Sequence, residues 1–147
     1  LSLPNKWKQV SMAKFDLDPK LGADTVEIGE LDLCRVLLMN DARYPWLILV
    51  PAKPDLAEIG DLCRNDRVVL SDEIEAASAA LTKLYNPLKL NVGALGNIVR
   101  QLHIHIVGRT KCDPAWPVPV WGHSPAEAYS DDALQLRVTE LGKALGV

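Results

Sequence analysis

The stretch V-R-Q-L-H-I-H-I-V-G-R at residues 99–109 constrains the fold more than any other part of this 147-residue chain. Apolar and polar side chains alternate along it, and a period of two is typical of a β-strand, in which successive side chains point to opposite faces. One face then carries Leu102, Ile104 and Ile106, which suit a buried core. We therefore predict a strand over residues 98–107 with one face turned to the core.

The opposite face of the predicted strand carries Gln101, His103 and His105 in a row, followed by Val107 and Arg109. Side chains two residues apart lie roughly 6–7 Å from each other along a strand. An imidazole is a nucleophile and a proton carrier near neutral pH. On a rigid strand beside further hydrogen-bond donors, it can attack phosphorus while its neighbours hold the phosphate oxygens.

Further strands are predicted on both sides of a helical region. Two or three antiparallel strands come early in the chain, with a turn at residues 40–43, and one more strand precedes a glycine-bearing turn at residues 93–97. Their segments are residues 24–30, 33–39, 46–50 and 88–92.

Two longer helices and one short helix are predicted. Ser71 is a suitable N-cap, acidic residues follow it, and Pro87 ends that helix. A shorter helix is predicted for residues 55–64. The last helix begins after Ser130 and has one apolar stripe, which we expect to pack on its own domain and not on a partner. This stripe consists of Leu134, Val138, Leu141 and Leu145.

The composition excludes several classes of protein. Apolar residues make up 48% and charged residues 24% of the chain, which is typical of a globular protein. The net charge of −3 argues against a protein that coats nucleic-acid polymers. The longest run without Asp, Glu, Lys or Arg is residues 114–126, so no membrane span is expected, because a span needs roughly 18 apolar residues.

The cysteines and the first residues bear on the cellular compartment. Cys34, Cys63 and Cys112 are odd in number and widely spaced, which argues against a disulfide framework or a zinc site of the CxxC type. Reduced thiols fit a cytoplasmic protein. Lys6 and Lys8 interrupt any apolar segment at the start, so no secretory signal is expected.

Two other interpretations of the histidine pair stay open at this point. His103 and His105 have the His-x-His spacing of metal ligands on a strand, and His123, Cys112 or Asp113 would then complete the set. The two histidines also fit a strand face where they are packed without any chemical role. A closed set of ligands is not apparent, so we expect no bound metal.

The segment Gln101–Val107 resembles the signature of the histidine triad (HIT) superfamily, in which three histidines alternate with apolar residues. Gly108-Arg109 after it and Gly96-Asn97 before it also resemble this family, the latter pair lying where hydrolases of the fragile-histidine-triad type carry Gly-Gln. The order of predicted elements is similar over residues 24–121. The departure is at the first signature position, where Gln101 can donate and accept hydrogen bonds but cannot take up a proton.

The resemblance implies an α+β fold, with an antiparallel sheet of about five strands, a packed helix and an additional C-terminal helix. It divides the chain into an N-terminal extension (1–23), a HIT-like domain (24–122) and a C-terminal helical extension (123–147). It also implies a homodimer that acts on a small-molecule nucleotide, without a cofactor, a membrane or a nucleic-acid polymer as partner.

The same resemblance assigns catalytic roles. His103 occupies the position of the nucleophile, which attacks the α-phosphorus of a nucleoside phosphate such as a diadenosine polyphosphate. A covalent nucleotidyl-histidine forms, and water then releases the mononucleotide. His105 and Gln101 would hold the phosphate oxygens, and His105 would handle a proton because Gln101 cannot. Restoring histidine by Gln101→His is expected to leave activity equal or higher.

Further residues are candidates for binding the nucleotide. Asn40 is the choice for the ribose hydroxyls, with Asp41 as a close competitor. Asn97 and Arg109 would contact phosphates, and Asn91 would reach sugar or phosphate. In a proline-rich loop, Trp116 and Trp121 are expected to pack in the core, although base stacking or a dimer contact also fits them.

Three functions remain open on the sequence. The favoured one is hydrolysis or transfer at the α-phosphate of a diadenosine polyphosphate, and a nucleoside phosphoramidate is the alternative substrate. Because Gln101 replaces a histidine, a nucleotide-binding regulator with little turnover is the second possibility. The third is a metal-binding protein that uses His103 and His105.

Overall fold

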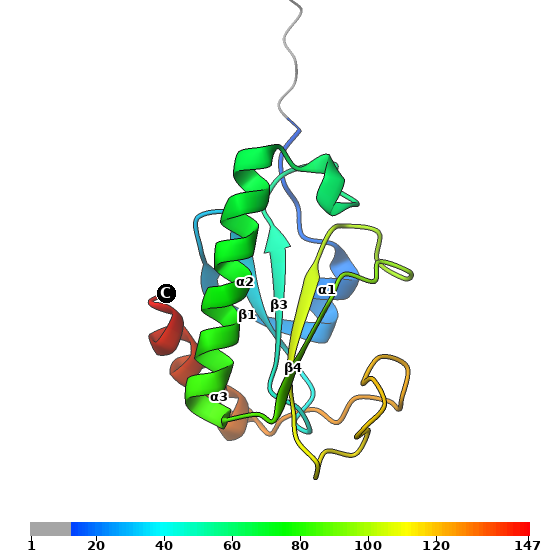
Figure 1. The fold of residues 1–147 in the computed structure, drawn as a ribbon, viewed down its shortest axis with the longest axis vertical. Helices are drawn as coiled ribbons and strands as arrows, with labels where there is room; N and C mark the ends of the chain where they lie inside the picture. Colours follow the sequence, from blue (N-terminus) through cyan, green and yellow to red (C-terminus); the bar gives the residue numbers. More distant parts are fainter. Residues whose placement is uncertain (1–12) are drawn as a thin grey trace, which may run out of the picture.

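Five antiparallel strands form one sheet in the part of the chain, residues 13–147, that the computed structural model describes (Figure 1). They are β1 (Thr25–Glu30), β2 (Cys34–Met39), β3 (Trp46–Pro51), β4 (Lys89–Gly93) and β5 (Ile104–Arg109). The order across the sheet is β1-β2-β3-β5-β4, and every neighbouring pair is antiparallel. This sheet, together with its helices, confirms the predicted α+β class.

Strand β5 begins six residues later than predicted. Its first residue, Ile104, pairs with Leu49 of β3, while β4 ends at Gly93, opposite His105. Upstream of this point the backbone is irregular, and the Leu102 amide donates to the Leu56 carbonyl in a loop. Alternation along a strand therefore does not fix the direction of a side chain at position 101.

The helices agree with the sequence in part. Helix α3 (Asp131–Leu145) begins after the predicted cap, Ser130, whose side chain accepts from the Ala133 amide. Helix α2 (Arg64–Tyr85) begins seven residues before Ser71, at an N-cap formed by Cys63. The short helix predicted for residues 55–64 is wrong, because only the single 3₁₀ turn η1 (Ile59–Asp61) forms there.

One short helix was not predicted. Helix α1 (Pro19–Asp24) has Asp18 as its N-cap, whose carboxylate accepts from the Lys20 amide, and all but its last residue lies within the predicted N-terminal extension. The tail expected over residues 1–11 lies outside the described residues.

The two faces of the sheet are covered by different elements. Helix α2 lies across one face, in front of the sheet in Figure 1, and α3 packs beside it. Leu141 of the α3 stripe is buried in this core, and Leu134, Val138 and Leu145 pack against it, which confirms the expected packing on the same domain. The second face carries Trp46, Ile48 and Val107, and α1 covers part of it through Leu21.

No helix within residues 13–147 combines the length and the apolar character that crossing a membrane requires.

Candidate active site

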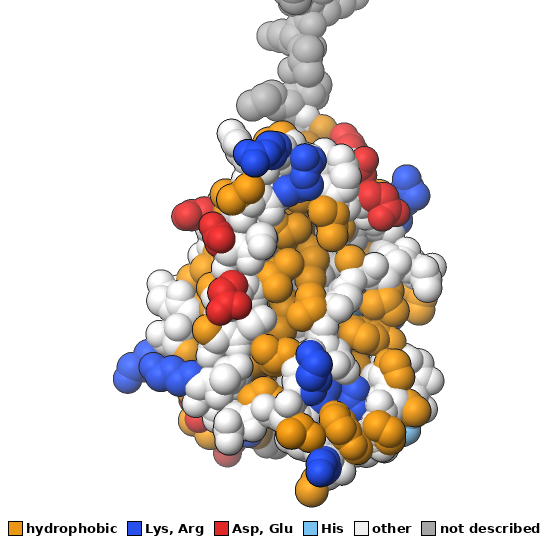
Figure 2. Space-filling model, viewed as in Figure 1, with side chains coloured by type: hydrophobic (Ala, Val, Ile, Leu, Met, Phe, Trp, Pro, Cys, Tyr) orange, Lys and Arg blue, Asp and Glu red, His pale blue; other side chains and the backbone are white. Residues whose placement is uncertain are grey.

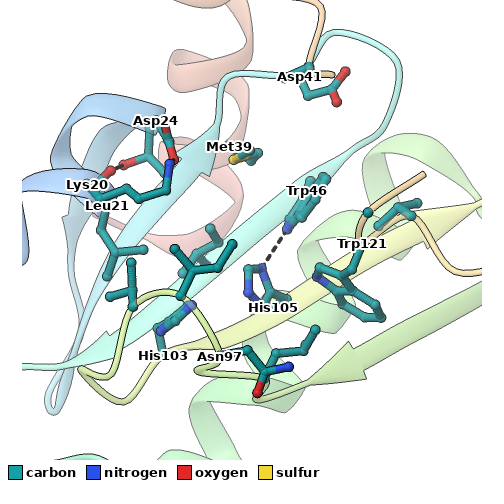
Figure 3. Close-up of a pocket in the computed structure, with 18 of the residues that line it drawn as sticks. Lys20, Leu21, Asp24, Met39, Asp41, Trp46, Asn97, His103, His105 and Trp121 are labelled. Atoms are coloured by element: carbon teal, nitrogen blue, oxygen red, sulfur yellow. Dashed lines mark hydrogen bonds and ion pairs between the residues drawn. The ribbon is translucent and has the colours of Figure 1, made fainter. Parts of the chain in front are cut away.

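A cavity of about 450 Å³ opens on the second face of the sheet (Figure 3). Its volume lies in the range of small-molecule sites. Segments far apart in the chain form its walls, and most of the lining is apolar. Among the lining residues are Lys20, Leu21 and Asp24 of α1, Met39, Asp41, Trp46 and Ile48 near β2 and β3, Asn97 before β5, His103, His105, and Trp121 after β5.

His103 is held in one tautomer by the backbone. Its ring is buried, and Nδ1 lies 2.7 Å from the carbonyl oxygen of Gln101. A carbonyl oxygen only accepts, so Nδ1 carries the hydrogen and Nε2 keeps its lone pair. A neutral ring with a free Nε2 lone pair is the nucleophilic form of imidazole.

His105 is held in the opposite tautomer by a side chain. The indole N–H of Trp46 donates to Nδ1 of His105 at 3.0 Å, as the dashed line in Figure 3 shows. Because an indole N–H only donates, Nδ1 of His105 carries the lone pair and Nε2 carries the hydrogen. Burial, and secondarily the charge of His103, lower the pKa of His105 to about 4. Near pH 7 it is thus a neutral hydrogen-bond donor, which differs from the proton carrier expected from the sequence.

Two tryptophans enclose the His105 ring. The ring centroids of Trp46 and Trp121 each lie 5.6 Å from that of His105, and the two indoles meet edge to face at 6.4 Å. Trp121 thereby forms part of the cavity wall, beyond the packing role that the sequence favoured for it. Such enclosure removes water from His105, and this is the physical reason for its low pKa.

Trp46 is a residue of the site that the sequence did not predict. Trp46 and Ile48 are two residues apart in β3, so their side chains point to the same face of the sheet. Ile48 lies opposite His105 in the register of β3 and β5. Trp46 is therefore a diagonal neighbour on the same face, within reach of a long side chain. Pairing β3 with β5 is not readable from the sequence, since the two strands are separated by α2 and β4.

A second, smaller hollow of about 40 Å³ adjoins the first beside His103. Its lining is mainly polar and includes Glu58, Arg100 and Gln101. The two hollows share Leu95, Gly96 and His103. His103 thus lies between a large, mainly apolar space and a small, mainly polar one.

Of the two residues predicted to bind the ribose, only Asp41 lines the cavity. Asn40 is absent from the cavity lining, and its side-chain oxygen accepts from the Tyr129 amide. Asp41 lines the cavity, is buried, and forms an ion pair with Arg43. Burial opposes ionisation of Asp41, but the hydrogen bonds and charge of Arg43 outweigh it and hold the pKa of that carboxyl below its usual range. Asp41 is therefore an ionised acceptor at the cavity.

Asn97 lines the main cavity as expected for a phosphate contact, whereas Arg109 and Asn91 do not. The Arg109 side chain is 1% exposed and donates to Asp113, to Asn91 and to the Val118 carbonyl. Burial opposes ionisation of Asp113, but the hydrogen bonds from Arg109 outweigh it and keep the pKa of that carboxyl low. The expected phosphate contacts of Arg109 and Asn91 are replaced by this buried network.

Gln101 lies at the small hollow and not in the lining of the large one. Its side-chain oxygen accepts from the Asp18 amide at 2.9 Å, and its side-chain nitrogen donates to the Asp16 carbonyl at 2.8 Å. Both polar ends of the side chain are therefore engaged by the segment that leads into α1.

Metal ligands do not gather in the described part of the chain. Residues 13–147 contain no group of three or more His, Cys, Asp or Glu side chains placed to hold an ion. His123, considered as a third ligand, lies beside Ser124, whose hydroxyl is 3.0 Å from its Nδ1. Cys34, Cys63 and Cys112 are free.

Comparisons with known proteins agree with this geometry. The HIT domain matches residues 20–112, a range that includes all of α1 except Pro19 and so begins inside the predicted N-terminal extension. A histidine triad (HIT) protein from Sinorhizobium meliloti is 43% identical, with a TM-score of 0.87, and the match covers 90% of this chain and 98% of that protein.

Two further solved structures are similar to the same extent. A histidine triad protein from Bradyrhizobium japonicum has 42% identity, a TM-score of 0.88, and coverage of 90% of this chain and 99% of the other. One from Marinobacter aquaeolei has 42% identity, a TM-score of 0.89, and coverage of 91% and 98%. The search of curated proteins found no match. The chain belongs to the histidine triad family, whose members are generally nucleotide-binding hydrolases and transferases.

Proposed function

We propose that this protein cleaves a nucleoside phosphate compound at its α-phosphorus through a covalent nucleotidyl-histidine on His103. The observation that carries the proposal is the tautomer of His103. The Gln101 carbonyl fixes the hydrogen on Nδ1 and leaves the Nε2 lone pair at the junction of the two hollows.

The first chemical step forms the bond from Nε2 of His103 to phosphorus and breaks the bond from phosphorus to the leaving-group oxygen. The electron pair of the broken bond leaves with that oxygen. In the second step water attacks phosphorus, loses a proton to solvent, and releases the mononucleotide and the imidazole. The Nε2–H of His105 and the amide of Asn97 stabilise negative charge on the non-bridging oxygens.

The leaving group in this proposal is a nucleoside polyphosphate, which departs through a phosphate oxygen. Gln101 carries no titratable proton, and His105, with a pKa of about 4, is neutral and tied to Trp46. A phosphate leaving group departs as an anion near pH 7, whereas the nitrogen of a phosphoramidate must be protonated as its bond breaks. A diadenosine polyphosphate is therefore the favoured substrate, and a phosphoramidate the alternative.

The nucleoside occupies the large cavity in this proposal. Its base lies against apolar walls that include Leu21, Met39 and Ile48, and no charged group is needed to hold it there. The ionised carboxylate of Asp41 accepts hydrogen bonds from the ribose hydroxyls and takes the place first given to Asn40.

Slow turnover would make the protein a nucleotide-binding regulator, and one observation favours this second candidate. The nucleophile has Gln101 and a neutral His105 as its signature neighbours, so neither speeds the steps by transferring a proton. Binding does not depend on such transfer and would persist.

The expected homodimer would form through the open edge of the sheet. Within residues 13–147, strand β4 is paired with β5 alone, so its other edge can pair with β4 of a second copy in an antiparallel manner. Figure 2 shows a band of hydrophobic side chains beside α2. Val68 of α2, Leu88 just before β4 and Val92 of β4 are about half exposed. Light scattering should give twice the mass of one chain, and Val92→Lys should lower it; a wild-type monomer would contradict the dimer.

The test of the function combines two substrates with two histidine variants. Wild-type protein is incubated with a diadenosine polyphosphate or an adenosine phosphoramidate, with and without a chelator, and released mononucleotide is measured. His103→Ala should lower turnover by about ten-thousandfold or more, roughly 5.5 kcal/mol of barrier, with nucleotide binding little changed. His123→Ala, in the loop outside the cavity lining, serves as the matched control and should retain activity.

The outcomes separate the candidates. Nucleotide binding without cleavage of either compound would favour the regulator. Loss of activity with the chelator would favour a metal-dependent protein, and wild-type turnover by His103→Ala would show that the covalent mechanism is wrong.

A further inference from the structure

The side chain of Gln101 joins two parts of the chain that are more than eighty residues apart. Its oxygen accepts from the Asp18 amide and its nitrogen donates to the Asp16 carbonyl, so one amide group bonds both polar sides of one backbone segment. Gln101 is absent from the lining of the large cavity, and its amide has committed its oxygen and one of its two N–H groups to the segment, which argues against a contact with phosphate in that cavity.

The segment held by Gln101 forms one wall of the large cavity. Leu21 is buried in the core of that face, and Phe15 and Leu17 pack against the same core. Lys20, Leu21 and Asp24 line the cavity. The α1 helix is only six residues long, so its position depends on tertiary contacts and not on its own helical stability.

The backbone of Gln101 acts on the nucleophile at the same time. Its carbonyl oxygen accepts the hydrogen bond from Nδ1 of His103 at 2.7 Å. The backbone around position 101 is not part of a strand, so the ladder of β5 does not hold it there. The side-chain bonds to Asp16 and Asp18 are separate from this contact, because the carbonyl that accepts from His103 remains in any variant at position 101.

We propose that Gln101 is a positioning residue, which latches residues 15–24 against the signature segment as a wall of the nucleotide cavity. It does not act as a phosphate ligand. The proposal rests on the proposed function insofar as the cavity holds a nucleotide. It gives the glutamine at the first signature position a role that histidine does not fulfil.

Amide geometry explains why glutamine suits this role. An amide presents a donor and an acceptor side by side in one direction, which matches a backbone N–H and a carbonyl two residues apart. The two nitrogens of an imidazole point in widely different directions, so one ring cannot make both bonds. In contrast to the expectation from sequence, Gln101→His should weaken the latch and lower the affinity for substrate.

Hydrogen–deuterium exchange of peptides from residues 13–24 tests the latch without any substrate. Gln101→Ala should speed exchange in this segment by about tenfold, because two hydrogen bonds that restrain it are lost. Gln101→Glu keeps the acceptor for the Asp18 amide and loses the donor to the Asp16 carbonyl, so it should give an intermediate effect. Unchanged exchange in Gln101→Ala overturns the latch, whatever the activity.

A matched pair at Asp18 isolates the backbone bond. Asp18→Ala removes the helix cap but keeps the amide N–H, whereas Asp18→Pro removes both, and the φ of −52° at this residue already suits proline. In the wild-type background Asp18→Pro should speed exchange more than Asp18→Ala. In the Gln101→Ala background the two should be equal, and a remaining difference would contradict the bond to Gln101.

Steady-state kinetics test whether the latch affects substrate binding in the cavity. Gln101→Ala should raise the KM for the diadenosine polyphosphate by about tenfold and change kcat by less than about threefold. A phosphate ligand would instead lower kcat and leave exchange of residues 13–24 as in the wild type, which overturns the proposal. Faster exchange with unchanged KM overturns the link to the nucleotide. Where the wild type binds no nucleotide, the proposed function fails, and the exchange data still decide whether the latch exists.

Discussion

The two ends of the segment from Gln101 to Arg109 use polar side chains differently. At the far end, Arg109 is buried with its donors committed to Asp113, Asn91 and the Val118 carbonyl. At the near end, His103 and His105 are buried as well, but each has a partner for Nδ1 only. The free ring nitrogens at the near end are available to a ligand, whereas the far end is closed.

Electrostatics explains the difference. A buried guanidinium is always charged and is tolerated only when paired and hydrogen-bonded. A buried imidazole can become neutral, as the low pKa of His105 shows, and then needs fewer partners. All of these residues are polar and buried, but they differ in how many of their polar atoms have hydrogen-bond partners. Arg109 has its donors engaged and stabilises the structure, whereas His103 and His105 each keep a ring nitrogen for a ligand.

The largest effect at the closed end should be on stability. Arg109→Met leaves the Asp113 carboxylate buried without its partner, so we expect the free energy of unfolding to fall by about 3–5 kcal/mol. Denaturant titration measures this, and kcat of the folded protein should stay near the wild-type value. Lys89→Met, an exposed change opposite Arg109 in the register, is the control and should alter stability by less than about 0.5 kcal/mol. A fall in kcat at unchanged stability would break the contrast between the two ends.

The difference between the two ends was not predictable from the sequence, although much of the fold was. Alternating patterns and short apolar runs predicted a segment for each of the five strands, and Ser130 identified the start of α3. Two of the three partners of Arg109, Asp113 and Val118, lie in the loop after β5, and the path of a proline-rich loop depends on tertiary packing.

The errors near the site have a common cause. The start of β5 was placed at residue 98 because an apolar-polar pattern continues into an irregular loop. Helix α1 was missed because it is short and depends on long-range contacts: Gln101 bonds the Asp18 amide before it, and its own Leu21 is buried in the core of the second face. Local patterns describe local structure, and the contacts that define this cavity are long-range. His103, His105 and Asn97 were placed at one site by the resemblance, and the cavity does bring them together.

The next effect, at the near end with His103 and His105, is on the pH dependence of stability. The pKa of His105 is about 4 in the folded chain and about 6.5 in an unfolded one, so the unfolded state binds more protons between these values. This group therefore stabilises the fold fully above about pH 6.5, and the contribution, about 3 kcal/mol, is lost as the pH falls towards 4.

Denaturant titrations from pH 7 to pH 4.5 measure this loss. His105→Asn is the matched variant, since its side-chain oxygen can accept from Trp46 but cannot titrate, and its stability should depend less on pH over this range. If the free energy of unfolding changed equally with pH in the wild type and in His105→Asn, His105 would not be held neutral in the folded chain. The proposed contrast with Arg109 would then fail.

The smallest effect concerns the bond between Trp46 and His105. Trp46→Phe keeps an aromatic ring in the core but removes the donor to Nδ1, so both tautomers of His105 become accessible. We expect kcat to fall by about tenfold, equivalent to about 1.4 kcal/mol of barrier, because Nε2 no longer always carries its hydrogen. Nitrogen-15 NMR of the imidazole should show mixed tautomers.

Trp121→Phe is the matched control, since the Trp121 indole N–H is buried without a partner among the described residues, so its removal breaks no hydrogen bond. Equal loss of kcat in both variants would indicate that packing around His105 matters and that its tautomer does not.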